Sequence, residues 1–146
     1  MLKGIPPIIS PALLKALCEM GHGDELVIAD GNFPSESMGA NSIVIRADGH
    51  GAPEILEAIL KLIPLDPDVE KPIALMELTP GETCPTPEIW QVYKDILQAH
   101  EPDNHQIDMM ERFAFYERAK KAYLIIATGE TAIYANVLLK KGVIKN

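Results

Sequence analysis

Apolar side chains recur along the chain with two different spacings. Leu13, Leu17 and Met20 are spaced as on one face of a helix, and the preceding Ser10-Pro11 is typical of a helix start. The pattern predicts a helix over about 11–20, ended by Gly21. The run 26–29 is instead short, continuous and apolar, which indicates a buried strand.

The same two spacings alternate through the rest of the chain. Helices are expected at 53–63, 86–97 and 113–122, and strands at 25–29, 42–46, 73–78, 106–110, 123–127 and 136–139. Loops rich in Gly and Pro are expected at 31–39 and 79–87, and an acidic connector at 65–71. This alternation predicts an α/β fold: a three-layer α/β/α domain over residues 1–146, with a mixed, mostly parallel sheet.

Charge and composition narrow the possible partners. The formal net charge of −8 argues against binding to nucleic acid or to an anionic membrane. No apolar run approaches the ~18 residues of a membrane span, and the first residues lack the pattern of a signal peptide. We therefore expect a cytoplasmic protein, in which Cys18 and Cys84 are free thiols.

Two residues with candidate catalytic side chains flank the first predicted strand. His22 comes just before it and Asp30 just after it. An imidazole and a carboxylate are common tools for moving protons near neutral pH. Both residues also have a plain alternative, because His22 fits a turn and Asp is common at turns after strands. For Asp30 the alternative to a turn is a ligand site, since α/β proteins bind ligands at the carboxyl ends of their strands.

The separation of these two residues limits how they can cooperate. A straight strand of about five residues, at ~3.3 Å each, places their side chains ~17 Å or more apart. Either the chain bends near Gly23, or one pocket takes His22 from one subunit and Asp30 from its neighbour. We favour the second interpretation.

The remaining histidines and the large aromatic residues are expected to be structural. His50, His100 and His105 are interpreted as surface residues, and no pair of histidines has the helical spacing of a metal site. Trp90 and Tyr93 are expected to pack in the core rather than to stack on a ligand.

Several motifs together resemble a known family. They are Gly21-His22-Gly23-Asp24 with Asp30, Phe33-Pro34, Ile45-Arg46-Ala47-Asp48-Gly49, Arg112-Phe113-Ala114-Phe115-Tyr116-Glu117-Arg118-Ala119, Tyr134-Ala135-Asn136 and Leu138-Leu139-Lys140-Lys141-Gly142-Val143. Over nearly its whole length the chain resembles the RbsD/FucU family of sugar mutarotases and pyranases. The Arg112 segment resembles the fucose-type branch, whereas Asn32 departs from the His expected there.

The resemblance implies an RbsD-like fold and an isomerase that interconverts the α and β anomers of L-fucose or a closely related aldopyranose. It implies His22 as proton donor, with Asp30, Arg112, Tyr134, Ala135 and Asn136 binding the monosaccharide. It implies neither metal nor cofactor. It also implies a ring-shaped homo-oligomer, often a decamer, for which we expect sites at the subunit interfaces.

The chemistry fits this expectation but leaves alternatives open. Anomer exchange opens and recloses a cyclic hemiacetal, so a group titrating near neutral pH is enough to catalyse it. A D-ribose pyranase and a non-catalytic monosaccharide-binding protein remain as alternatives. Whether Tyr134 or Tyr116 takes part in proton transfer is also left open.

Overall fold

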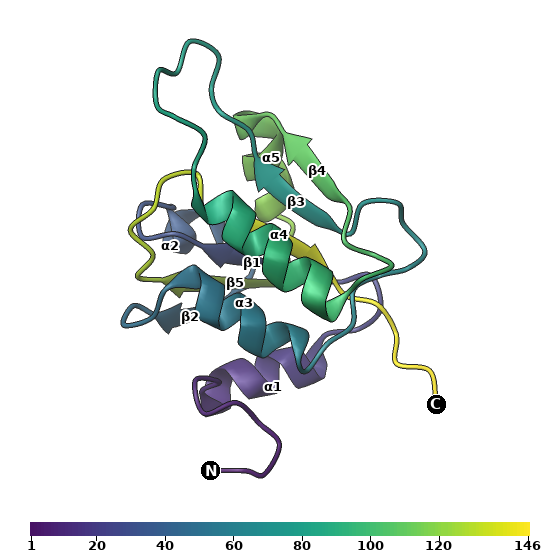
Figure 1. Cartoon of the computed structure of the whole chain (residues 1–146). Helices are drawn as coiled ribbons and strands as arrows, with labels where there is room; N and C mark the ends of the chain where they lie inside the picture. Colours follow the sequence, from purple (N-terminus) through teal and green to yellow (C-terminus); the bar gives the residue numbers. More distant parts are fainter.

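The computed structural model describes residues 1–146 and is organised around one six-stranded sheet (Figure 1). The strands are β1 (Glu25–Ala29), β2 (Ile43–Ala47), β3 (Ile73–Met76), β4 (Ile107–Met110), β5 (Leu124–Thr128) and β6 (Val137–Lys140). Their order across the sheet is β2-β5-β1-β6-β3-β4. The expected strands are therefore all present, within two residues of the expected bounds.

The sheet is mixed because β6 runs against both of its neighbours. β1, β2 and β5 pair in parallel, as do β3 and β4, whereas β6 is antiparallel to β1 and β3. Its first residue, Val137, lies opposite Ile28 near the end of β1. The segment before β6 therefore reaches the same sheet edge as the residues that follow β1, β3 and β4.

Helices cover both faces of the sheet, as the three-layer prediction requires (Figure 1). The helices are α1 (Pro11–Glu19), α2 (Ser35–Met38), α3 (Ala52–Leu60), α4 (Ile89–His100) and α5 (Arg112–Ala119). The larger core cluster joins one face of the sheet to α1, α3 and α4, and the smaller one joins the other face to α5. In β1, Leu26 and Ile28 belong to the first cluster while Val27 and Ala29 belong to the second, which explains why every residue after Glu25 in this strand is apolar.

Some local predictions were wrong in detail. The expected loop at 31–39 contains the single-turn helix α2, and α4 begins at Ile89 rather than near residue 86. Helix α1 ends at Glu19 with an extended Met20, so the left-handed glycine after it is Gly23, with φ of 85°, and not Gly21. No helix combines the length and hydropathy that crossing a bilayer requires.

Candidate active site

A small cavity lies at the edge where β1, β3 and β4 end and β6 begins. Its volume is about 150 Å³. It is lined by Asp30, Asn32, Phe33, Met76, Arg112, Tyr116, Ile133, Tyr134 and Asn136. Four of the residues expected to bind substrate therefore share this cavity, and they come from three separate segments of the chain. This is the edge at which open α/β sheets usually bind ligands.

Asp30 is fixed at the bottom of this site by backbone donors. Its Oδ1 accepts the N–H of Asn32 at 3.0 Å, and its Oδ2 accepts the N–H of Ala135 at 3.2 Å. The residue is only 5% exposed. Burial raises the pKa of the Asp30 carboxyl above its usual value, against the opposing effect of these backbone hydrogen bonds. Each oxygen keeps a second lone pair, so Asp30 is able to accept a hydrogen bond from a sugar hydroxyl.

The segment 134–136 is locked to Asp30 in two ways. Ala135 is fully buried and donates its N–H to the carboxylate, while the Asn136 side chain accepts the backbone N–H of Asp30 at 2.8 Å. Tyr134 has φ of 53°, the only positive φ outside glycine. For an aromatic residue such a conformation costs on the order of 1–3 kcal/mol and persists only where the surroundings hold it. Ala135 thus contributes its backbone rather than its side chain.

Arg112 supplies the positive charge of the cavity. It is the first residue of α5, whose N-terminus is capped by the Glu111 carboxylate. Its guanidinium carbon lies 5.4 Å from the ring centre of Phe113 and 5.5 Å from that of Tyr116. Only Nε donates within the chain, to the Tyr116 hydroxyl at 3.4 Å. The two terminal nitrogens therefore remain available to donate to ligand oxygens.

The structure adds residues that the motifs alone did not assign to the site. Phe33, Met76 and Ile133 form an apolar wall, and the Tyr116 ring lies 5.8 Å from that of Phe33. Tyr116, which the sequence left ambiguous, lines the cavity. The quoted Phe33-Pro34 motif was a signal for Phe33, whereas Met76 ends an ordinary buried strand and carries no sequence signal.

His22 does not reach this cavity. It precedes β1, at the opposite edge of the sheet, where the N–H of Gly23 donates to the carbonyl of Lys141 just after β6. Its Nε2 lies 3.0 Å from Asp66 Oδ1 and 3.5 Å from Asp68 Oδ2. A bend near Gly23 that joins His22 to Asp30 within one chain is therefore excluded, although Gly23 has a left-handed conformation.

Asp66 determines which nitrogen of His22 carries a proton. Burial raises the pKa of the Asp66 carboxyl, but hydrogen bonds from the N–H of Asp68 and from His22 outweigh it, so its pKa lies below the usual value. An ionised carboxylate only accepts, so His22 Nε2 must be the donor of this pair. Nδ1 then keeps its lone pair without a partner in the chain, on a side chain that is 42% exposed.

The same three side chains also have the arrangement of a ligand set. The ligand atoms of His22, Asp66 and Asp68 all lie within 4.8 Å of one another, close enough for one metal ion to contact all three. Such an ion would occupy the Nε2 position that now donates to Asp66. Sequence reasoning missed Asp66, because a buried aspartate at 3% exposure is indistinguishable in sequence from the other acids of the connector.

The other histidines and aromatic residues differ partly from expectation. His50 is exposed, as predicted, but His100 and His105 are half-buried, and His100 Nε2 lies 2.8 Å from Glu57. Trp90 and Tyr93 are buried in the larger core cluster, which confirms their packing role. Both also donate hydrogen bonds to the backbone of residues 134–135.

Comparisons with known proteins agree over the full length of the chain. Residues 3–144 match the model of the RbsD / FucU transport protein family. The chain is 52% identical to human fucose mutarotase over 147 residues, which cover 98% of this chain and 94% of that protein.

Two solved structures have closely similar folds. FucU from Bifidobacterium longum has a TM-score of 0.94 at 60% identity, and covers 98% of this chain and 100% of its own. The fucose mutarotase from Streptococcus pneumoniae, solved in complex with L-fucose, has a TM-score of 0.92 at 50% identity, and covers 99% and 100%.

Proposed function

Because this chain belongs to the RbsD / FucU transport protein family, we propose that it is an isomerase that interconverts the α and β anomers of L-fucose. Relatives about half identical to it, including the human protein, are named fucose mutarotase. The observation that carries the proposal is the convergence of Asp30, Arg112, Tyr134 and Asn136 on one small cavity. We propose that residues 1–146 form a single mutarotase domain.

The proposed reaction needs two proton transfers. The anomeric hydroxyl loses a proton while the ring oxygen gains one, the ring opens to the aldehyde, and rotation of the aldehyde lets it reclose from the other face. His22 Nδ1 accepts the proton of the anomeric hydroxyl and delivers it to the ring oxygen, both transfers reverse when the ring recloses, and Asp30 accepts a hydrogen bond from another hydroxyl. Positioned proton transfer of this kind contributes roughly 10²–10⁴-fold to a rate. This suffices for a reaction that also proceeds unaided.

The walls of the cavity suit a deoxy sugar. Arg112 and Asn136 offer donors to hydroxyl oxygens on the polar side. Phe33, Met76 and Ile133 offer an apolar surface to a carbon that bears no hydroxyl. L-fucose presents both, because its ring carries several hydroxyls and one methyl group.

The position of His22 leads to the second part of the proposal, a site shared between subunits. We propose a homo-oligomer in which His22 of one chain lies over the Asp30 cavity of the next. The resemblance to the family implies that this assembly is a ring, often of ten subunits. Ile133, which lines the cavity, and Phe113, which packs against Arg112, are 48% and 66% exposed, as apolar residues that a neighbouring subunit covers would be in a single chain. We also propose a cytoplasmic location, with which the free thiols of Cys18 and Cys84 agree.

Saturation-transfer NMR on a panel of free sugars tests the function. We expect the protein, but not the same sample after boiling, to accelerate exchange between the anomers of L-fucose more than those of D-galactose. Acceleration of pyranose–furanose exchange of D-ribose alone would instead identify a pyranase. Binding of fucose without faster exchange would identify a binding protein.

A further inference from the structure

Tyr134 is held in a conformation that its own residue type disfavours. Its φ of 53° is left-handed, a region in which a Cβ meets the following carbonyl. Gly4, Gly23 and Gly81 occupy the same region without this conflict. A strained aromatic residue at a ligand cavity persists only if neighbouring groups fix its backbone.

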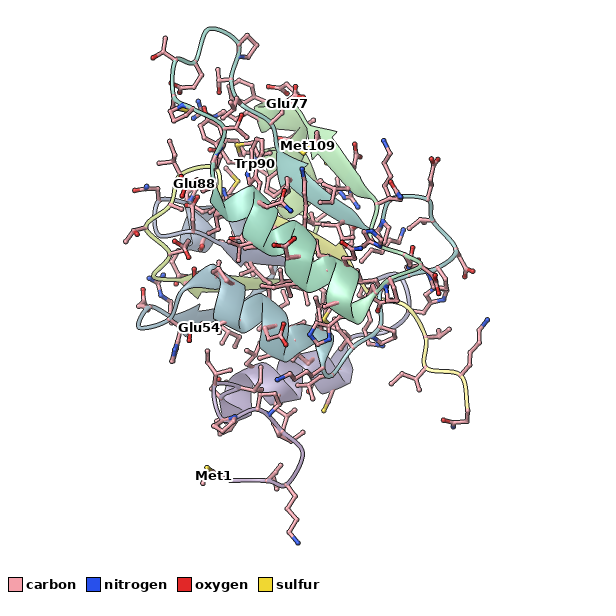
Figure 2. All side chains as sticks on the ribbon, viewed as in Figure 1. Met1, Glu54, Glu77, Glu88, Trp90 and Met109 are labelled. Carbon is pink, nitrogen blue, oxygen red and sulfur yellow. The ribbon has the colours of Figure 1, made fainter.

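Two side chains of α4 fix that backbone. Trp90 Nε1–H donates to the carbonyl of Tyr134 at 2.7 Å, and the Tyr93 hydroxyl donates to the carbonyl of Ala135 at 2.7 Å. The two residues are three apart and so lie on the same face of the helix. Trp90 lies in the first turn of α4, below the projecting loop that joins β3 to α4 (Figure 2). Neither residue lines the cavity itself.

The opposite side of the same peptide units is held by the site. The N–H of Ala135 donates to Asp30 Oδ2, between the two carbonyls that α4 binds. The Tyr134 side chain lines the cavity, and its hydroxyl reaches the loop after β3, where it lies 3.2 Å from Thr79 Oγ1 and 3.3 Å from Glu82 Oε2. The position of the Tyr134 hydroxyl therefore depends on the two donors of α4.

We propose that Trp90 and Tyr93 are positioning residues of the sugar site, which hold Tyr134 in its left-handed conformation so that its side chain lines the cavity while its hydroxyl binds the loop after β3. This inference rests on the proposed mutarotase function. It assigns to α4 a role beyond core packing, carried out by two hydrogen bonds that a purely apolar core would not need. Burial raises the pKa of the Tyr93 hydroxyl, which keeps it protonated as a donor.

Conservative variants remove each donor while keeping an aromatic ring. Trp90→Phe loses the indole N–H and Tyr93→Phe loses only the hydroxyl. We expect each to lower kcat/KM for L-fucose anomer exchange about tenfold in the wild-type background. In the Tyr134→Phe background, which already lacks the positioned hydroxyl, we expect each to lower it less than about twofold. Tyr123→Phe, which removes a hydroxyl bound to Glu19 at the opposite edge of the sheet from the Asp30 cavity, is the matched control and leaves the rate unchanged.

The result that overturns the inference is an equal loss in both backgrounds, because a general structural defect does not depend on the Tyr134 hydroxyl. If Trp90→Phe does not fold, Tyr93→Phe decides alone. A second readout separates this inference from the proposed function: the ring signals of ¹³C-labelled Tyr134 should shift in both α4 variants and not in Tyr123→Phe. If the wild-type protein fails to exchange fucose anomers, the function is wrong, and unshifted Tyr134 signals would still refute the positioning role separately.

Discussion

Replacing His22 with Gln is expected to lower the catalysed rate of L-fucose anomer exchange by roughly 10²–10⁴-fold, the contribution of a positioned acid–base group. Gln keeps a side chain that can donate to Asp66 but has no nitrogen that can take up and release a proton. Saturation-transfer NMR measures the exchange rate directly. Because His22 is nearly half exposed, and Asp66 still accepts the N–H of Asp68, we expect the variant to fold normally.

His50→Gln is the control for this experiment. His50 is also exposed and also lies beside a carboxylate, that of Glu54 at 3.4 Å, but it does not line the Asp30 cavity. The control should exchange fucose anomers at the wild-type rate. A His22→Gln protein as fast as the control would remove His22 from the mechanism.

The second large effect is expected for Asp30→Asn. The amide keeps one acceptor oxygen, but its NH₂ group faces either the N–H of Asn32 or that of Ala135, so one of these donors loses its partner. Loss of a charged hydrogen-bond acceptor for the sugar costs about 1.5–3 kcal/mol. The corresponding fall in kcat/KM is roughly 10- to 100-fold. Kinetics across a range of fucose concentrations, followed by NMR, measures it.

The pH dependence of the free energy of unfolding, compared between the wild type and Asp30→Asn, checks the direction of the pKa shift assigned to Asp30. Since burial raises the pKa of Asp30 in the folded protein, the folded state binds the proton more tightly than the unfolded chain does. The contribution of Asp30 to stability is therefore lost as pH rises from its unfolded value, about 4, through the raised folded value. Urea unfolding between these pH values should show that fall in the wild type and a smaller one in Asp30→Asn. A steeper fall in the variant would contradict the assigned pKa direction.

The sheet was predictable because its information is local. The run Leu26–Ala29 is apolar at every position, which only a strand covered on both faces requires, and β1 is such a strand. The antiparallel direction of β6 was not predictable in the same way. Nothing within Val137–Lys140 distinguishes an antiparallel central strand from a parallel one, since both are buried on two faces.

The site likewise contains residues that the local sequence predicts and contacts that it does not. Asp30 follows a recognisable strand, so its place at a ligand-binding edge was a reasonable expectation from sequence. The pairing of His22 with Asp66 joins residues 44 positions apart, and no periodicity reports such a contact. The hydrogen bonds of Trp90 and Tyr93 were hidden for another reason. Their aromatic rings account fully for the helical spacing, so the sequence pattern gives no hint that their polar atoms have separate partners.

The shared site is tested most directly by mixing two variants that are each impaired in a different half of the proposed site. His22→Gln and Asp30→Asn chains are unfolded together in equal amounts, refolded, and assayed for L-fucose anomer exchange. If each cavity combines Asp30 of one chain with His22 of the next, a site is intact when its Asp30 comes from a His22→Gln chain and its His22 from an Asp30→Asn chain. This combination occurs in about one quarter of random interfaces. We therefore expect recovery of about a quarter of the wild-type activity. Activity that stays at the sum of the two separate variants would contradict a site built from two subunits.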